Sequence, residues 1–152
     1  METVKNGTAA TREKPGVTVY VCHNAFPPAG RLPRQWEQDG VRVRVKEIPC
    51  SGKIDVQYLF HAVESGLSGV CVVTCPEGKC RLSQGNYRAE VRILTVKRLL
   101  EEIGMEPERV ALLRSSPEDS AERLADTVRQ VVGRFASLGT SPVCAGACAS
   151  PT

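Results

Sequence analysis

Four cysteines of this 152-residue chain are spaced in a way that could bind a metal or an iron–sulfur cluster: Cys22, Cys50, Cys75 and Cys80. Only the last two are close together, in a C-x4-C spacing. Four thiolates around one place suit a 2Fe–2S cluster, a 4Fe–4S cluster or a structural zinc ion. Zinc sites usually take close pairs in both halves, so the spread spacing favours a cluster. The third alternative is unligated thiols, because free cysteine is a common buried residue.

The remaining cysteines and one histidine are less suited to ligation. Cys71 lies in the middle of an apolar run, which predicts a core thiol. Cys144 and Cys148 resemble a ligand pair, but they lie in a tail rich in glycine, alanine and serine, so we interpret them as incidental. His23 follows Cys22 directly and could ligate as in Rieske-type sites, although a hydrogen bond at the rim of the site is the simpler expectation.

The elements that position these residues are predicted to be strands alternating with helices. Apolar or alternating runs indicate four strands, at 17–22, 41–50, 69–75 and 109–116. This pattern predicts an α/β fold with a single open four-stranded parallel sheet flanked by helices, Rossmann- or flavodoxin-like. The predicted organisation is a flexible arm at 1–16, an iron–sulfur α/β domain at 17–138 and a disordered tail at 139–152.

Two helices are expected before the third strand. A short helix around 34–38 would carry Trp36 inward. A longer one follows Asp55 as the N-cap and stops at Gly66.

Two further helices flank the fourth strand. The first ends at Gly104, and four of its apolar residues fall near one helical face: Val91, Leu94, Leu99 and Ile103. The second would begin after Ser116 as the N-cap, with Pro117 at its first position, and run to about Leu138.

The predicted sheet brings the four thiols to one edge. Cys22, Cys50 and Cys75 end the first three strands, and ligands of open α/β sheets bind beyond the carboxyl ends of the strands. Cys80 lies in the loop that leaves the third strand. The nearby loops also carry basic side chains that suit an anionic cluster, although such residues are usually just solvated: Lys53, Lys79, Arg81 and Arg88.

Composition and charge exclude several classes of function. The net charge of +3 and the lack of a long basic run argue against nucleic-acid binding. No apolar stretch approaches the ~18 residues of a membrane helix, and the opening segment lacks the apolar core of a signal peptide, so we expect a cytoplasmic protein without membrane insertion. The sequence has no G-x-G-x-x-G, no P-loop and no Ser–His–acid set. We expect a chain that catalyses nothing by itself.

Three motifs resemble those of a known family: IPCSGKID at 48–55, GVCVVTCPEGKC at 69–80, and the segment starting QGNYRAEV at 84–110. They are similar to the small iron–sulfur (delta) subunits of methyl-viologen-reducing hydrogenase and heterodisulfide reductase complexes, the MvhD family. The resemblance implies an electron-transfer subunit with a 2Fe–2S cluster. It also implies partners: a hydrogenase or other dehydrogenase on one side, and a flavin-containing heterodisulfide-reductase-like subunit on the other.

One departure from the family pattern affects the site. The family usually has C-x2-C at the end of the first strand, whereas this chain has Ala25 at the second position, in CHNA. Four cysteines still satisfy a cluster. The change leaves open an alternative, a cluster-free or zinc-stabilised structural adaptor in the same kind of complex. The proline-rich loop FPPAGRLP at 26–33 also differs from the family's usual loop and would alter a partner surface.

Overall fold

The computed structural model describes five stretches of the chain: 15–23, 25, 32–76, 84–115 and 120–139. Several predictions concern residues outside these stretches, namely the arm at 1–14, the tail from 140 on, and Lys79, Cys80, Arg81, Ser116, Pro117, Cys144 and Cys148.

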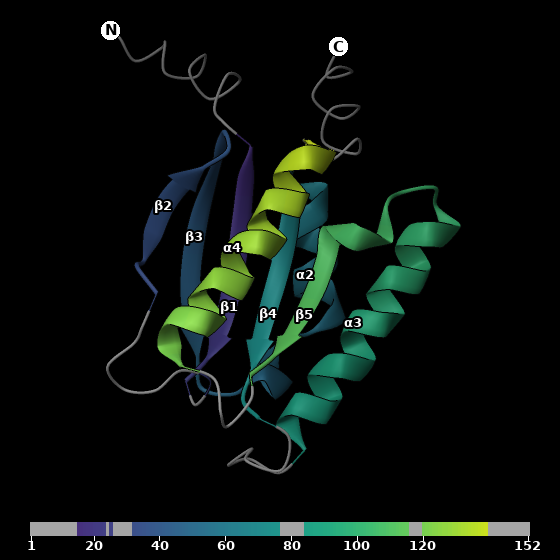
Figure 1. Cartoon of the computed structure of the whole chain (residues 1–152). Helices are drawn as coiled ribbons and strands as arrows, with labels where there is room; N and C mark the ends of the chain where they lie inside the picture. The colour runs from purple at the N-terminus through teal and green to yellow at the C-terminus, as the bar shows by residue number, and fades with distance from the viewer. Residues whose placement is uncertain (1–14, 24, 26–31, 77–83, 116–119, 140–152) are drawn as a thin grey trace, which may run out of the picture.

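The described residues form one sheet in which four neighbouring strands are parallel (Figure 1). The strands are β1 (Gly16–Cys22), β2 (Gln35–Gln38), β3 (Val41–Ile48), β4 (Gly69–Thr74) and β5 (Val110–Arg114). Their order is β2-β3-β1-β4-β5, and β2 pairs antiparallel with β3 at one edge. The predicted α/β class and parallel strands are therefore confirmed, but the sheet has five strands and is mixed rather than all parallel.

The additional strand β2 replaces the short helix predicted around 34–38. Asp39 and Gly40 both have positive φ, 50° and 83°, and they form the two-residue turn of a hairpin into β3. An Asp-Gly pair before an alternating strand is the sequence signal that favours this hairpin. Trp36 is half-buried and packs against the core. The prediction that it points inward is therefore right, although a strand and not a helix carries it.

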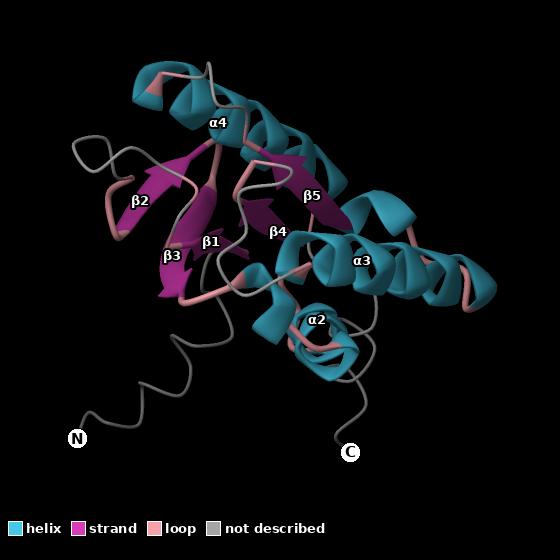
Figure 2. Ribbon diagram, turned by 90° about the horizontal axis from the view of Figure 1, so that it is seen from below, coloured by secondary structure: helices cyan, strands magenta, loops and turns pink. Residues whose placement is uncertain are grey.

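Helices cover both faces of the sheet (Figure 2). Helix α4 (Ala121–Leu138) packs on one face, where its buried residues join the odd-numbered valines of β1 in a first core. Helices α2 (Val56–Glu64) and α3 (Gly85–Glu102) pack on the other face and form a second core with Val70 and Val72 of β4. Two short 3-10 helices, η1 (Ser51–Lys53) and η2 (Pro107–Arg109), connect these elements. No helix in the described stretches is long and apolar enough to span a membrane.

The buried face of α3 differs from the predicted one. The helix buries Ala89, Ile93, Val96 and Leu100, which follow one another at helical spacing. Of the four residues predicted to share the core face, Leu99 is half-buried and three are exposed: Val91, Leu94 and Ile103, at 43%, 57% and 61%. The helix carries apolar residues on two faces, and only the packing selects one of them. The prediction of its end was right, since Gly104 has φ of 83° just after the helix.

The remaining helix boundaries agree with the sequence except at the start of α4. Asp55 is the N-cap position of α2, and Gly66 has φ of 95° just beyond its end. Helix α4 starts at Ala121 because Ser120 is its N-cap, whose Oγ accepts a hydrogen bond from the Arg123 amide at 3.1 Å. The predicted cap at Ser116 was therefore several residues too early. The predicted end at Leu138 is confirmed.

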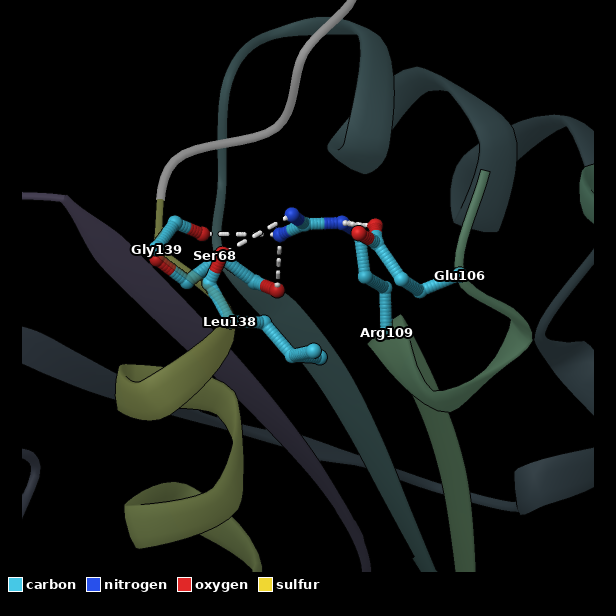
Figure 3. Close-up of polar contacts among 5 residues, drawn as sticks. All are labelled: Ser68, Glu106, Arg109, Leu138 and Gly139. Atoms are coloured by element: carbon cyan, nitrogen blue, oxygen red, sulfur yellow. Dashed lines mark hydrogen bonds and ion pairs between the residues drawn. The ribbon is translucent and has the colours of Figure 1, made fainter. Parts of the chain in front are cut away.

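One buried arginine ties the elements together where the parallel strands begin (Figure 3). Arg109 is 1% exposed, and its Nε donates to Oε1 of Glu106 at 2.8 Å. Its Nη1 donates to the carbonyl oxygens of Ser68 at 3.0 Å and Gly139 at 2.8 Å, and its Nη2 donates to that of Leu138 at 3.1 Å. The guanidinium thus joins η2, the start of β4 and the end of α4.

Candidate functional site

Three of the four predicted ligand cysteines lie at the carboxyl edge, the end of the sheet where the parallel strands finish; it is at the bottom of Figure 1. Cys22 is the last residue of β1, Cys50 lies just beyond β3, and Cys75 directly follows β4. All three are buried, at 2%, 4% and 1% exposure. The fourth, Cys80, is outside the described stretches.

Cys22 and Cys75 belong to the core between the sheet and α4. Both join the first core cluster, together with Ala25, which is 7% exposed. The Ala25 amide donates to the carbonyl of Cys22 at 2.8 Å, so the chain turns immediately after β1. The position of the family's additional cysteine is therefore buried in the same cluster as two of the predicted ligands.

Cys50 lies at the start of η1 and already accepts a hydrogen bond. Its Sγ accepts from the amide of Gly52 at 3.4 Å. Amide-to-sulfur bonds of this kind stabilise a thiolate, which is the form of cysteine that binds iron or zinc. The local fold after β3 thus places a backbone donor at the Cys50 sulfur.

The loop after Cys50 is held against α3 by a charged side chain and a close backbone contact. The Arg92 guanidinium, through Nη1, donates to the carbonyl oxygens of Gly52 and Ile54, the latter at 2.7 Å. A Cβ added to Gly52 would lie 2.8 Å from the Cα of Gly85 at the start of α3. Only glycine fits this approach without backbone movement, which gives a physical reason for the glycine of the P-C-S-G motif.

Substituting Gly52 by alanine should therefore destabilise the fold. We expect Gly52→Ala to lower the free energy of unfolding by about 1–3 kcal/mol, the usual range for overpacking against backbone. Urea unfolding of the iron-free chain measures this. The control is Gly133→Ala in α4, where the new Cβ would make only ordinary contacts at 3.6 and 3.9 Å. That change should be neutral or stabilising. Equal losses for the two variants would contradict the close approach at Gly52.

Two buried hydroxyl groups adjoin the predicted ligands, and the sequence analysis did not identify them. Ser51 and Thr74 are both 0% exposed, and neither side-chain oxygen has a hydrogen-bond partner in the described part of the chain. Ser51 directly follows Cys50, and Thr74 directly precedes Cys75. The available signal was the hydroxyl residue beside a cysteine in P-C-S-G and V-V-T-C. A third such hydroxyl, of Ser68, lies at the opposite end of β4.

Two side chains that the sequence analysis did not assign as ligands, Cys71 and His23, lie in mid-strand and at the exposed end of β1. Cys71 is fully buried in the middle of β4, and this burial raises the pKa of its thiol to about 12, so it stays protonated. Its prediction as a core residue is confirmed. His23 is exposed beside Cys22, with Nδ1 3.7 Å from Oε1 of Glu47. Its backbone amide donates to the carbonyl of Ile48 at 2.8 Å, which keeps β1 paired to β3 up to the rim.

A pocket of about 470 Å³, with both apolar and polar lining residues, opens beside Cys22 at the ends of β1 and β3. Its charged and titratable lining residues are His23, Arg34, Lys46 and Glu47.

Of the basic residues noted in the sequence near the cysteines, Lys53 and Arg88 are described, and both are exposed, as expected for solvated side chains.

The three described thiols do not by themselves surround a single ion. Within the described stretches, no three His, Cys, Asp or Glu side chains are grouped closely enough to hold one metal. The structure thus places Cys22, Cys50 and Cys75 at one edge of the sheet, each at the end of a different strand.

Comparison with known proteins gives one family. Residues 17–139 match the family described as methyl-viologen-reducing hydrogenase, delta subunit. The vhu iron–sulfur subunit of the F420-non-reducing hydrogenase of Methanocaldococcus jannaschii is 33% identical over 101 residues, 66% of this chain and 75% of that protein. The iron–sulfur subunit of the same name from Methanococcus maripaludis is 29% identical over 131 residues, 86% of this chain and 97% of that protein.

A second kind of relative is much larger. It is a subunit of the ferredoxin:CoB-CoM heterodisulfide reductase of Methanosarcina mazei, and it is 26% identical over 137 residues. The match covers 90% of this chain but only 17% of that protein. A domain similar to this chain is therefore joined to a longer polypeptide in the reductase.

Proposed function

Because the chain belongs to the family of methyl-viologen-reducing hydrogenase delta subunits, we propose that it is an iron–sulfur subunit that relays electrons within a larger oxidoreductase complex. The observation that carries this proposal is the set of three buried cysteines at the carboxyl edge of a sheet. Several relatives are named as iron–sulfur subunits of hydrogenases, and the edge is where open α/β sheets bind ligands.

We propose Cys22, Cys50, Cys75 and Cys80 as the ligands of a 2Fe–2S cluster. A structural zinc ion gathers its four ligands around one point. In a 2Fe–2S cluster the four thiolates are shared between two irons, two on each. Donors that come from three separate strand ends, with only Cys75 and Cys80 close in sequence, favour the second arrangement.

The protein supplies three things to such a cluster, whose own chemistry when bound is one-electron oxidation and reduction. The thiolates would fix it to the ends of three parallel strands, of which β1 and β4 are largely buried. Burial of Cys22, Cys50 and Cys75 keeps water from the ligand sulfurs. The Gly52 amide donates a hydrogen bond to the Cys50 sulfur, which offsets negative charge at that ligand.

The proposed partners follow from the relatives. In the Methanosarcina mazei heterodisulfide reductase, the matching domain is part of a longer polypeptide. We propose that this chain docks as a separate protein on a flavin-containing, heterodisulfide-reductase-like partner. We further propose that it receives electrons in the cytoplasm from a hydrogenase or other dehydrogenase, since the relatives named as iron–sulfur subunits belong to hydrogenases.

The alternative is an adaptor that holds such a complex together without a cluster, or with zinc. One observation favours it: Ala25, buried beside Cys22 and Cys75, occupies the family's fifth cysteine position. If that cysteine were essential to the cluster, this chain would keep the fold and lose the cofactor.

Metal and sulfide analysis of anaerobically purified protein separates these functions. We expect about two irons and two sulfides per chain, with visible charge-transfer absorption, as a 2Fe–2S cluster requires. Zinc without sulfide would instead establish a zinc-stabilised fold. A colourless, metal-free protein that still copurifies with its complex would establish the adaptor and overturn the relay.

A further inference from the structure

Strand β5 is an edge strand whose sequence resembles that of a central one. It is last in the order β2-β3-β1-β4-β5, so within the described stretches no strand pairs with its outer side. Its segment VALL at 110–113 is apolar on both faces, a pattern typical of buried parallel strands. Ala111, Leu112 and Leu113 are nevertheless only half-buried. The other edge strand, β2, is short and polar, as expected of an edge that meets water.

The backbone of β5 presents hydrogen-bonding groups to its outer side. The Ser115 amide donates to the Thr74 carbonyl at 3.1 Å, which fixes the phase of the ladder between β4 and β5. In a parallel pair, alternate residues direct both their amide and their carbonyl to the same neighbour. Ala111 and Leu113 therefore face β4, and the amide and carbonyl of Leu112 point outward. An edge of this kind is a template for pairing with another strand.

A groove of about 320 Å³ lies along this edge between α3 and α4. Its apolar lining includes Ile93 and Leu94 of α3, Leu112 of β5, and Val131 and Phe135 of α4. Leu94 is 57% exposed. Figure 1 and Figure 2 both show α3 extending past β5 on the open side. An extended segment placed beside β5 would therefore also cover apolar side chains of the groove.

The charges at the rim of the groove indicate what such a segment should carry. Glu90 is already paired with Arg114, with 2.6 Å between Oε1 and Nη2. Lys97 donates to a carbonyl of η2 at 3.1 Å and interacts with Glu108. Arg134 of α4 is exposed and makes no ion pair or hydrogen bond with the described part of the chain. Its guanidinium is therefore available to a carboxylate of an incoming segment.

The topology indicates that this segment belongs to another molecule. The crossover from β4 to β5 places α3 on one face of the sheet, and α4 covers the opposite face (Figure 2). If the chain after α4 supplied a parallel strand beside β5, the connection would be a left-handed crossover, which is rare. The proposed function already requires another molecule, the heterodisulfide-reductase-like partner.

We propose that the outer edge of β5 and the groove beside it bind an extended segment of the heterodisulfide-reductase-like partner. The segment pairs with the backbone of Leu112 and extends the sheet by one strand. Its side chains are mostly apolar, to fill the groove against Leu94 and Phe135, and one carboxylate meets Arg134. This inference rests on the proposed function and adds to it the place and the chemistry of the contact.

Binding of the purified partner subunit to the anaerobically purified chain tests the inference. Leu112→Pro removes the outward amide, and edge strands tolerate proline where the amide faces outward. Its matched control is Leu112→Ala, which shortens the side chain but keeps the amide. Arg134→Glu reverses the charge at the rim, and its control is Arg44→Glu, at an exposed arginine of β3. Circular dichroism establishes that each variant is folded.

We expect Leu112→Pro to raise the dissociation constant about tenfold or more and Leu112→Ala to raise it less, because only proline removes a backbone hydrogen bond. Arg134→Glu should raise it about tenfold, and Arg44→Glu should leave it unchanged. Wild-type affinity in a folded Leu112→Pro variant would overturn the inference. Equal losses in the two Leu112 variants, or in the two arginine variants, would also overturn it.

Amide hydrogen exchange of the wild-type chain decides the inference if Leu112→Pro does not fold. The Leu112 amide should exchange about tenfold or more slowly in the complex than in the isolated chain. An unchanged rate would overturn the inference. A dimer of the isolated chain that already protects this amide would overturn it too, since a second copy would occupy the edge. A wild-type chain that binds no reductase-like subunit would refute the proposed partner itself, and the inference with it.

Discussion

Replacing Cys50 or Cys75 with alanine is expected to remove most of the bound iron, whereas replacing Cys71 with alanine should leave the iron content unchanged. Cys50 and Cys75 follow the ends of β3 and β4 at the carboxyl edge, and each would supply one of four thiolates. Cys71 is equally buried but lies in mid-strand. Burial raises its thiol pKa to about 12, so it offers no thiolate near neutral pH. Alanine is preferred to serine because a serine hydroxyl can itself bind iron.

Iron and acid-labile sulfide per folded chain are the quantities to measure for these cysteine variants. Circular dichroism of each variant separates loss of the cluster from loss of the fold. The Cys71→Ala variant controls for the cavity that any buried cysteine leaves, since all three substitutions delete the same sulfur atom. Iron lost from the Cys71 variant and kept by the Cys50 variant would mean that the ligands are not the strand-end cysteines.

The sequence predicted best those strands whose apolar residues are mostly buried in the structure. The segments at 17–22 and 69–75 are continuously apolar because β1 and β4 are central strands with helices on both faces. Parallel pairing then requires their last residues to share an edge. The positions of Cys22 and Cys75 therefore followed from sequence alone.

Other features depended on packing that a single sequence does not encode locally. Helix α3 has apolar residues on two faces, and contact with Val70 and Val72 selects the one that contains Ile93 and Val96. Strand β2 is short and polar, and it forms because the Asp39–Gly40 turn folds it onto β3. The sequence shows hydroxyl residues beside two cysteines, Ser51 and Thr74, but their lack of a hydrogen-bond partner is visible only once their described neighbours are placed.

Arg109→Met is expected to destabilise the chain by about 3–5 kcal/mol. The methionine fills part of the space but donates no hydrogen bond. The carbonyl oxygens of Ser68, Leu138 and Gly139 would lose the donor that joins the start of β4 to the end of α4 (Figure 3). Several unsatisfied acceptors at one site explain why the cost should exceed that of a surface substitution. Urea unfolding of the iron-free chain gives the free energy.

The control for this variant is Glu106→Gln, which should cost less than about 1 kcal/mol because the carboxylate is 44% exposed. The hydrogen bond from Arg109 lowers the pKa of Glu106 from 4.5, so its contribution is present above that pH and fades as the pH falls through the lowered value. The loss of unfolding free energy in Arg109→Met should be the same at pH 7 and at pH 4, because the carbonyl partners of Arg109 do not titrate. Since the arginine lies at the opposite end of the sheet from the cysteines, molecules of Arg109→Met that remain folded should keep their iron. If Arg109→Met loses little unfolding free energy at pH 7, or only as much as Glu106→Gln, the ion pair rather than the carbonyl contacts stabilises this end of the fold.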